Sequence, residues 1–389
     1  MAIRPIRIVM EGVTGRLGTQ QHLIRSLMAI RTEGGLQLAS GDRLVPEPVL
    51  LGRNPDKLGA LAAVHSGLDW STSAEECLAD PRNEIYFDVS ATGGRAERVK
   101  RAIAAGRHVY LEKPIASSLH EAIDLARTAE RARVKHGTVQ DKLFLPGFRK
   151  MRSVRDAGLL GQILSVRIEF GWWIFNGELH PSQRSSWNYK RSEGGGLILD
   201  MFPHWRYIVD NLFGRMVAVS CRYTTQQPRR LDESGREYAV DVEDEAFSTV
   251  ELDNGAIVQI NASWATRVRR DDMLTVQVDG EKGSAVCGLH RCFVQPLATT
   301  PKPVWNIEAP RTEDLRDYWQ EVPNLEPFRN SYRAGWEAFL RHVVEDAPFP
   351  SPLIEGAKGV QLAEACYRSH AERRWIDLPE LDPAQVGRA

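Results

Sequence analysis

The chain has 389 residues, a length that favours two domains over one. Its hydrophobic content of 42% and charged content of 26% are typical of a globular protein, and its net charge of −1 argues against a nucleic-acid partner. The sequence has no signal-peptide core near its start and no apolar run of membrane-spanning length, so we expect a cytoplasmic protein without a membrane partner.

The first part of the chain alternates between strand-like apolar runs and helical patterns. The expected strands are Ile6–Met10, Pro48–Leu51, Ile85–Ser90, His108–Leu111 and Gly137–Gln140. The expected helices are Thr19–Arg31, Asp56–His65, Arg95–Ala105 and Leu119–Val134. Such alternation indicates a doubly wound parallel sheet, so we predict an α/β Rossmann domain over residues 1–145.

After Pro146 strand-like runs dominate, and nine of the ten tryptophans lie beyond this point. The expected strands are Ile163–Trp173, Val217–Thr224, Ala246–Leu252, Ala256–Trp264 and Leu274–Val278, and Asp253-Asn254-Gly255 is a strong hairpin signal. Helical patterns lie between Gly194 and Phe213 and over Tyr332–Glu345 and Leu353–Arg374. We predict an α+β domain with an open, mostly antiparallel sheet over residues 146–389.

A glycine loop follows the first strand and precedes the first helix. Its sequence is Gly12-Val13-Thr14-Gly15-Arg16-Leu17-Gly18, with the spacing GxxGxxG instead of the commoner GxGxxG. Glycines let the backbone approach a pyrophosphate, and the helix N-terminus offers free N–H groups. We expect dinucleotide contacts from Gly12, Thr14, Gly15, Arg16 and Leu17; the alternative is an ordinary strand-to-helix turn.

The choice of dinucleotide is usually set at the end of the second strand, where NAD enzymes carry an acid. This chain has Gly52, Arg53 and Asn54 there, and no acid. Arg53 or Lys57 could pair with the 2′-phosphate of NADP, whereas Asn54 could bond the free ribose of NAD. Arg53 could also stack on adenine or lie in solvent. We expect NAD, with NADP as the open alternative.

Three further segments carry residues suited to chemistry. Lys113 follows a strand at the carboxyl edge of the sheet, where ligands bind, and Pro114 beside it is a candidate for a cis peptide bond. Lys142 lies on the exit from the last Rossmann strand, and could face the same cleft. For each lysine the plain alternative is a solvated loop residue.

Asp200 and His204 lie four residues apart, a spacing that puts both on one face of a helix. A histidine beside a carboxylate suits proton transfer near neutral pH. Pro203 should disturb this helix unless it lies in the first turn. The alternatives are a buried hydrogen-bonded pair or a metal site, but no third ligand is evident.

The five cysteines contain no CxxC motif, and we expect reduced thiols. Cys287 and Cys292 could form half of a metal site, but no second pair follows. We therefore predict no metal.

Together these segments resemble the Gfo/Idh/MocA oxidoreductases. The resemblance covers nearly the whole chain and includes the glycine loop, Glu112-Lys113-Pro114, the segment leading to Phe144 and Pro146, and Gly-Gly-Gly-x-x-x-Asp-x-x-x-His at residues 194–204. It implies that His204 is the base or acid on the reacting hydroxyl, that Lys113 polarises its oxygen, and that Asp200 orients His204 or the sugar. It also implies cofactor contacts from Thr92, Glu112 and Lys113 and a homo-oligomer, dimer or tetramer, formed through the open sheet.

Three departures from the family pattern stand out. The first glycine loop is Gly-x-x-Gly instead of Gly-x-Gly. The usual Thr-Pro-Asn becomes Thr92-Gly93-Gly94, and the aspartate that often follows the histidine by three is replaced by Tyr207. The first two alter the cofactor site, and the third alters the substrate end.

The second domain supplies aromatic and hydrogen-bonding groups that suit a sugar. Trp172 and Trp173 cannot share one side of a strand, so we expect at least one in the core and Trp187 as the better platform. By strand alternation Arg267 and Arg269 would share a face and could grip an anionic substituent, the alternative being a solvated charge cluster. The expected substrate contacts are Lys142, Trp172, Trp187, Asn188, Tyr189, Lys190, Arg267 and Arg269.

Three functions fit these features. The first is NAD(P)-dependent oxidation of a secondary hydroxyl, at C3, of a sugar or glycoside. The second is a redox-neutral glycosidase that oxidises C3 transiently, as in the NAD-dependent sulfoquinovosidases, whose sulfonate an arginine cluster would fit. The third is a dinucleotide-sensing regulator without catalysis, against which Lys113, Asp200 and His204 argue.

Overall fold

A computed structural model describes residues 2–180, 184–303, 306–308, 313–324 and 327–381. The chain divides into two compact units. Unit 1 comprises Met1–Asp141 and Arg329–Glu364 with the described residues from Glu380 onward, and unit 2 comprises Lys142–Phe328 and Ala365–Pro379. Our division at residue 145 therefore differs from these units, because it assigned every later residue to the second domain.

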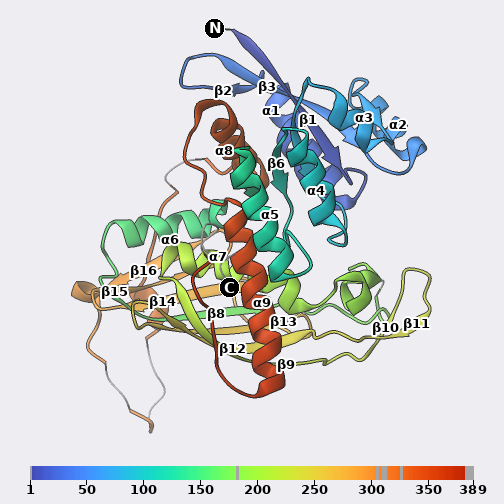
Figure 1. The fold of residues 1–389 in the computed structure, drawn as a ribbon. Coiled ribbons are helices and arrows are strands. Elements are labelled where there is room, and N and C mark those ends of the chain that lie inside the picture. The colour runs from blue at the N-terminus through green and yellow to red at the C-terminus, as the bar shows by residue number, and fades with distance from the viewer. Residues whose placement is uncertain (1, 181–183, 304–305, 309–312, 325–326, 382–389) are drawn as a thin grey trace. The chain divides into compact units, whose positions relative to one another are not determined.

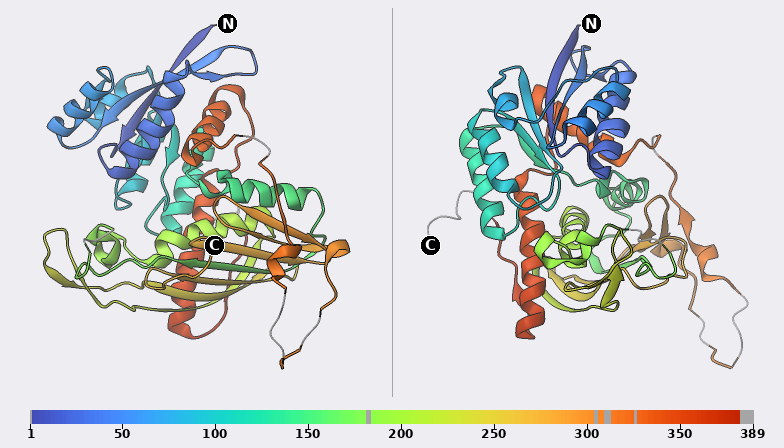
Figure 2. Two further views of the ribbon diagram at one scale, coloured as in Figure 1. Left: turned by 180° about the vertical axis from the view of Figure 1, so that it is seen from behind. Right: turned by 90° about the vertical axis from the view of Figure 1, so that its right-hand side faces the viewer.

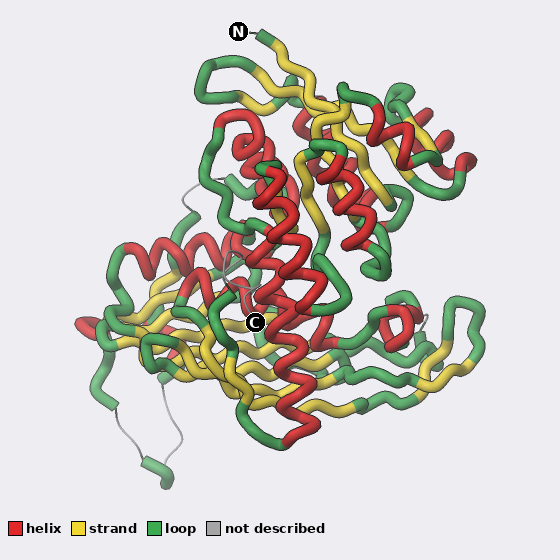
Figure 3. The backbone as a smooth tube through the Cα atoms, viewed as in Figure 1, coloured by secondary structure: helices red, strands yellow, loops and turns green. Residues whose placement is uncertain are grey.

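Unit 1 is built on a parallel sheet whose strands alternate with helices along the chain (Figure 3). The parallel strands are β1 (Ile3–Glu11), β3 (Arg43–Leu51), β4 (Trp70–Ser71), β5 (Asn83–Asp88), β6 (His108–Leu111) and β7 (His136–Thr138). They lie in the order β4-β3-β1-β5-β6-β7, and the short β2 (Leu36–Gln37) pairs with β3 antiparallel. Numbered along the chain this is 3-2-1-4-5-6, the Rossmann order, which confirms the predicted fold of this part.

The helices of unit 1 come from both ends of the sequence (Figure 1). They are η1 (Gly18–Met28), α1 (Ala29–Thr32), α2 (Pro55–Val64), α3 (Ala74–Ala79), α4 (Arg95–Ala104), α5 (Leu119–Ala132), α8 (Ser331–Glu345) and the first part of α9 (Leu353–Glu372). Trp336 and Phe339 of α8 enter a core with Phe87 and Tyr110, while Leu353 and Val360 of α9 enter a second core. The sheet of unit 1 is therefore covered in part by helices from the C-terminal part of the chain.

The first helix differs in kind from the expected α-helix, because η1 is a π-helical stretch. Its wide turns are reflected in the hydroxyl of Ser26, which donates to the carbonyl five residues back at Gln21, at 2.7 Å. π-Helical turns are rare and are enriched at functional sites.

Unit 2 is built on one mixed sheet of nine described strands, in the order β17-β16-β15-β14-β8-β13-β12-β9-β18. All neighbours run antiparallel except β13 and β8, which confirms the predicted mostly antiparallel sheet. The strands are β8 (Ile163–Gly171), β9 (Met216–Thr224), β12 (Glu245–Leu252), β13 (Ile257–Ser263), β14 (Leu274–Gly280), β15 (Gly283–Cys287), β16 (Cys292–Pro296), β17 (Gln320–Glu321) and β18 (Ile376–Asp377). A separate hairpin is formed by β10 (Arg229–Leu231) and β11 (Glu237–Ala239).

Two helices of unit 2 pack on this sheet (Figure 2). Helix α6 (Pro146–Asp156) lies against β15 and β16, and α7 (Leu197–Leu212) lies against β9 and β12. Side chains alternate along the strands, so that Ala246, Val250 and Leu252 of β12 are buried while Phe247 is exposed. Short 3-10 turns complete the unit: η2 (Lys142–Phe144), η3 (Ser186–Tyr189), η4 (Arg191–Glu193), η5 (Leu297–Thr299) and η6 (Leu315–Tyr318).

In the described part of the chain, no helix is long and apolar enough to cross a membrane.

Candidate active site

The glycine loop is shaped by close approaches that leave no room for side chains. Gly12 has a φ of +80°, and a Cβ there would lie 2.7 Å from the backbone of Ser90. The amide of Gly15 closes the turn by donating to the carbonyl of Gly12 at 3.1 Å. A Cβ on Gly18 would lie 2.9 Å from the Cα of Val13, so this glycine lets η1 pack on the end of β1.

The middle of the loop is open to a ligand. Thr14, Gly15, Arg16 and Leu17 are all exposed. An extended dinucleotide can therefore approach the backbone at the start of η1, next to the switch point between β1 and β5. The residues present fit the cofactor that the sequence predicted.

At the end of β3, Asn54 has a structural role. Its side-chain oxygen accepts from the amide of Lys57 at 3.0 Å and caps α2, whose first residue is Pro55. Gly52 is buried, while Arg53 and Lys57 are exposed. The oxygen of Asn54 is thus engaged, which leaves its NH₂ group and the Arg53 guanidinium for the cofactor.

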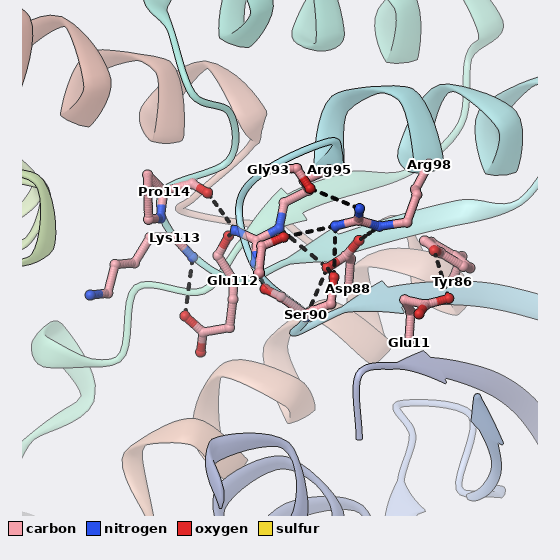
Figure 4. A network of polar contacts seen from close by, with 11 residues as sticks. Glu11, Tyr86, Asp88, Ser90, Gly93, Arg95, Arg98, Glu112, Lys113 and Pro114 are labelled. Carbon is pink, nitrogen blue, oxygen red and sulfur yellow. Dashed lines mark hydrogen bonds and ion pairs between the residues drawn. The ribbon is translucent and has the colours of Figure 1, made fainter. Parts of the chain in front are cut away.

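The carboxyl end of β5 holds an ionic cluster that sequence reasoning missed (Figure 4). Asp88 is fully buried and accepts from Arg95 Nε at 3.2 Å, from Arg98 Nε at 3.0 Å and from the amide and hydroxyl of Ser90. The sequence did carry a signal for this cluster. It is an acid at the end of a strand, followed by two arginines about one turn apart at the start of a helix. Thr92 lies within this turn, half-buried, with its carbonyl bonded to the amide of Arg95.

Lys113 lies just beyond β6, as predicted, and its peptide bond to Pro114 is cis. The side chain of Glu112 is buried and folds back, so that Oε2 accepts from the Lys113 amide at 3.1 Å. Its other oxygen lies 2.9 Å from His22 Nε2, and Trp336 Nε1 donates to His22 Nδ1 at 3.0 Å. Glu112 is therefore held by protein groups, and the sequence did not predict the partners His22 and Trp336.

In unit 2, helix α7 carries Asp200 and His204 one turn apart. Its start depends on glycine: Gly196 has a φ of +124°, and a Cβ there would lie 2.8 Å from Glu243 Oε1. That carboxylate also accepts from the amide of Ile198 at 2.8 Å, and so replaces an N-cap side chain. Burial raises the pKa of Glu243.

Pro203 does not interrupt α7, which corrects the expectation that it would disturb the helix. The helix continues to Leu212 although Pro203 lies beyond its first turn. The neighbouring side chains Phe202, His204 and Trp205 are buried, so packing compensates for the hydrogen bond that proline cannot make.

Arg184 is a further residue of this region that the sequence did not predict. Its Nη2 donates to Asp200 Oδ2 and to Asn188 Oδ1, both at 2.7 Å. Its guanidinium lies 4.4 Å from the ring centre of Trp264 and 5.7 Å from that of Trp172. The charge of Asp200 is thus paired within unit 2.

The predicted sugar-binding segment divides into surface and core residues. Trp187 is 46% exposed, Lys190 is half-exposed and pairs with Glu193 at 3.3 Å, and Asn188 is buried. Tyr189 is fully buried beneath Arg230, 3.9 Å from its ring centre, so its ring belongs to the core. Lys142 lies in η2, partly exposed.

The expectation that Trp172 or Trp173 is a core residue was wrong, and strand alternation does not apply to Arg267 and Arg269. β8 ends at Gly171, so Trp172 and Trp173 lie in a loop and neither is a core residue. β13 ends at Ser263, so strand alternation does not place Arg267 and Arg269 on one face; both are exposed in a loop. Arg267 lies 6.0 Å from the ring centre of Phe175.

Among the described residues, no group of three His, Cys, Asp or Glu side chains is arranged to hold a metal ion. Cys287 and Cys292 face each other across β15 and β16 as buried free thiols, and burial raises the pKa of both.

Comparison with known proteins gives consistent matches along the chain. Residues 6–139 match the model of an oxidoreductase family with an NAD-binding Rossmann fold, and residues 148–286 match the model of the GFO/IDH/MocA C-terminal domain. A D-xylose dehydrogenase from Paenarthrobacter nicotinovorans is 46% identical over 380 residues, which is 97% of this chain and 98% of that protein. A levoglucosan dehydrogenase from Pseudarthrobacter phenanthrenivorans is 23% identical, covering 86% of this chain and 90% of its own.

The fold is also found among solved structures. A levoglucosan dehydrogenase in complex with NADH and L-sorbose superposes with a TM-score of 0.81, covering 97% of this chain and 100% of that chain at 19% identity. At this level of identity the likeness concerns the fold.

Proposed function

Because this chain belongs to the Gfo/Idh/MocA family of oxidoreductases, we propose that it oxidises a hydroxyl group of D-xylose or a closely similar sugar with NAD. The enzyme class, an NAD-dependent sugar oxidoreductase, follows from the family and from a nearly full-length relative. The choice of D-xylose is supported by the 46% identity to a D-xylose dehydrogenase.

The proposed chemistry divides between two groups of residues. The Lys113 ammonium donates a hydrogen bond to the reacting hydroxyl and stabilises negative charge on its oxygen. His204 accepts the hydroxyl proton, and Asp200 orients His204 or the sugar. When bound, NAD supplies the ring that accepts the hydride leaving the same carbon. Proton and hydride together account for the two electrons and two hydrogens lost in forming the carbonyl.

The cofactor-binding residues are proposed as predicted from the sequence: Gly12, Thr14, Gly15, Arg16, Leu17, Gly52, Arg53, Asn54, Thr92, Glu112 and Lys113. Support comes from the exposed loop Thr14–Leu17 and from the Asn54 amide, whose NH₂ group remains for a ribose hydroxyl. Arg53 is exposed and would tolerate the 2′-phosphate of NADP, so the two dinucleotides should be compared by kcat/KM.

We propose the predicted substrate-binding residues again, but their burial changes the role assigned to two of them. Trp187 and Trp172 offer aromatic surface to a sugar, and Lys142, Lys190, Arg267 and Arg269 offer donors. Asn188 and Tyr189 are buried, and we assign them support of this region.

The test is to incubate the purified protein with NAD and a panel of sugars that includes D-xylose, and to follow reduced nicotinamide. Stoichiometric reduction with D-xylose is the expected result. No reduction with any sugar, despite NAD binding, would overturn the proposal.

The carbon that reacts is a separate question, answered by the product. We predict C3, which gives a ketone and no acid. Oxidation at the anomeric C1 gives a lactone, and its hydrolysis releases acid that titration detects. Release of a sugar from a glycoside, sulfoquinovosides included, without net reduction would instead identify the redox-neutral glycosidase.

A further inference from the structure

We propose that Arg95 is a positioning residue for Lys113, an inference that rests on the proposed function because it takes Lys113 to be the reacting lysine. Arg95 is the first residue of α4 and is only 2% exposed. Its Nη1 donates to the carbonyl of Glu112 at 2.8 Å and also to the carbonyl of Pro114. The guanidinium therefore binds the backbone immediately before and immediately after Lys113 (Figure 4).

The remaining N–H groups of Arg95 fix the guanidinium itself. Nε donates to the buried carboxylate of Asp88 at 3.2 Å, and Nη2 donates to the carbonyl of Ser90. Arg95 thus joins the end of β5 to the turn after β6 through a single planar group. A lysine could not replace it, because an ammonium cannot reach acceptors in these separate directions at once.

The Lys113 turn is held at a third point by the Glu112 carboxylate, which accepts from the Lys113 amide. With the carbonyls of Glu112 and Pro114 and its own N–H bound, the backbone of Lys113 is held in place. A reacting group displaced by about 1 Å can lose on the order of 100-fold in rate, so this anchoring bears directly on catalysis.

Two other arginines show that Arg95 is distinct. Arg98 shares Asp88 but bonds only the segment of Ser90, Ala91 and Gly93. Arg107 uses the same chemistry at the opposite end of β5, where it donates to the carbonyls of Asn83 at 2.7 Å and Leu78 at 2.8 Å. Arg107→Met is therefore a matched control that removes carbonyl bonds without touching the Lys113 turn.

The experiment compares Arg95→Met, Arg95→Lys, Arg107→Met and Lys113→Ala with the wild type, using NAD and the sugar that the wild type oxidises best. For Arg95→Met we expect kcat to fall about 10- to 100-fold while the Kd for NAD, from fluorescence titration, changes less than about threefold. Arg95→Lys should recover little of the loss. Arg107→Met should lose thermal stability but keep kcat within about twofold.

Chemical rescue supplies a readout that a purely structural role would not move. For this readout a further variant, Arg95→Ala, is needed: millimolar guanidinium should restore part of its kcat, because guanidinium can occupy the vacated site, and should not restore the kcat of Lys113→Ala. Equal kcat losses in Arg95→Met and Arg107→Met would overturn the inference, as would a kcat of Arg95→Lys equal to that of the wild type. Full activity in Lys113→Ala would instead overturn the proposed role of Lys113.

Discussion

The contact between Trp336 and His22 fixes which ring nitrogen of the histidine carries its proton. An indole N–H only donates, so His22 Nδ1 must accept. The proton then resides on Nε2, which donates to Glu112 Oε1 at 2.9 Å. His22 is therefore neutral in this arrangement. It bonds Glu112, which accepts from the Lys113 amide, and it links α8, η1 and the turn after β6.

Replacing His22 tests this chain of hydrogen bonds. His22→Leu leaves the buried Trp336 N–H and one Glu112 oxygen without partners, and we expect a loss of about 2–4 kcal/mol in the free energy of unfolding. His22→Gln keeps a donor near the position of Nε2 and should recover a good part of it. Urea denaturation measures both, and equal losses would contradict the assignment of Nε2 as the donor.

Lys113 and His204 are the residues on which the proposed reaction depends. Lys113→Ala and His204→Ala should each lower kcat by about 10²- to 10⁴-fold, because each removes a group that stabilises charge or transfers a proton in the transition state. Both variants should still bind NAD, as measured by titration with the reduced cofactor. Full activity in either variant would remove that residue from the site.

At the residue scale, Lys113, Asp200 and His204 stay predictions, which the sequence allows because the motifs that carry the family resemblance are local. Their hydrogen-bond partners lie outside those motifs. The bond between Trp336 and His22 joins residues 314 positions apart, and no local pattern predicts such a pair. Arg184 was missed for another reason, since its pairing with Asp200 depends on how the loop after β8 folds.

At the scale of elements, His136 connects strand β7 to helix α9. Its Nδ1 accepts from the amide of Leu353 at 3.2 Å, the first residue of that helix. Burial lowers the pKa of His136, Glu130 partly opposes the shift, and the charges of His342 and Lys135 add to it. Protonation of this histidine in the folded state is therefore unfavourable.

The lowered pKa sets the direction of a pH effect. The unfolded chain binds the proton more tightly, so stability is complete above the ordinary value of 6.5 and is lost as the pH falls through the lower folded value. His136→Asn keeps an acceptor and cannot titrate, so the unfolding free energy should fall less between about pH 7 and pH 5 than in the wild type. Identical pH profiles would show that His136 is not responsible.

Element prediction was most accurate where periodicity was strong. Strand β6 has its expected bounds, and α4 and α5 begin where expected and end within about two residues of the expected position, because apolar side chains repeat along them. Strand β3 begins at Arg43, well before the expected Pro48, and β8 ends at Gly171, before the expected Trp173. Pro203 led to a wrong expectation because the burial of α7 outweighs the unfavourable effect of a proline inside a helix.

At the scale of the whole molecule, the sheet of unit 2 exposes apolar side chains on one face. Phe247 on β12 is 47% exposed and Ile257 on the neighbouring β13 is 39% exposed, and both lie on the side opposite to the buried Val250 and Val258. Contiguous exposed apolar surface is typical of an interface, and Phe247 and Ile257 lie on neighbouring strands of one face.

We accordingly predict a homo-oligomer, dimer or tetramer, formed through this face. Phe247→Glu combined with Ile257→Glu should lower the molar mass measured by light scattering towards the 43.7 kDa of one chain. A double substitution at exposed Val64 and Ile3 in unit 1 serves as the control and should leave the mass unchanged. A wild-type protein that runs at the mass of one chain would refute the prediction.

The path of the chain through unit 1 has a consequence for how the protein is made. Trp336, Phe339 and Leu353 complete the cores of a Rossmann sheet whose last strand ends at Thr138, and nearly two hundred residues of unit 2 are synthesised in between. During translation Phe87 and Tyr110 therefore lack their packing partners until the C-terminal helices have been synthesised. Unit 2 is completed late as well, because its strand β18 and the second part of α9 lie within Ala365–Pro379, so both units acquire their last elements only after the segment from Arg329 onward has been synthesised.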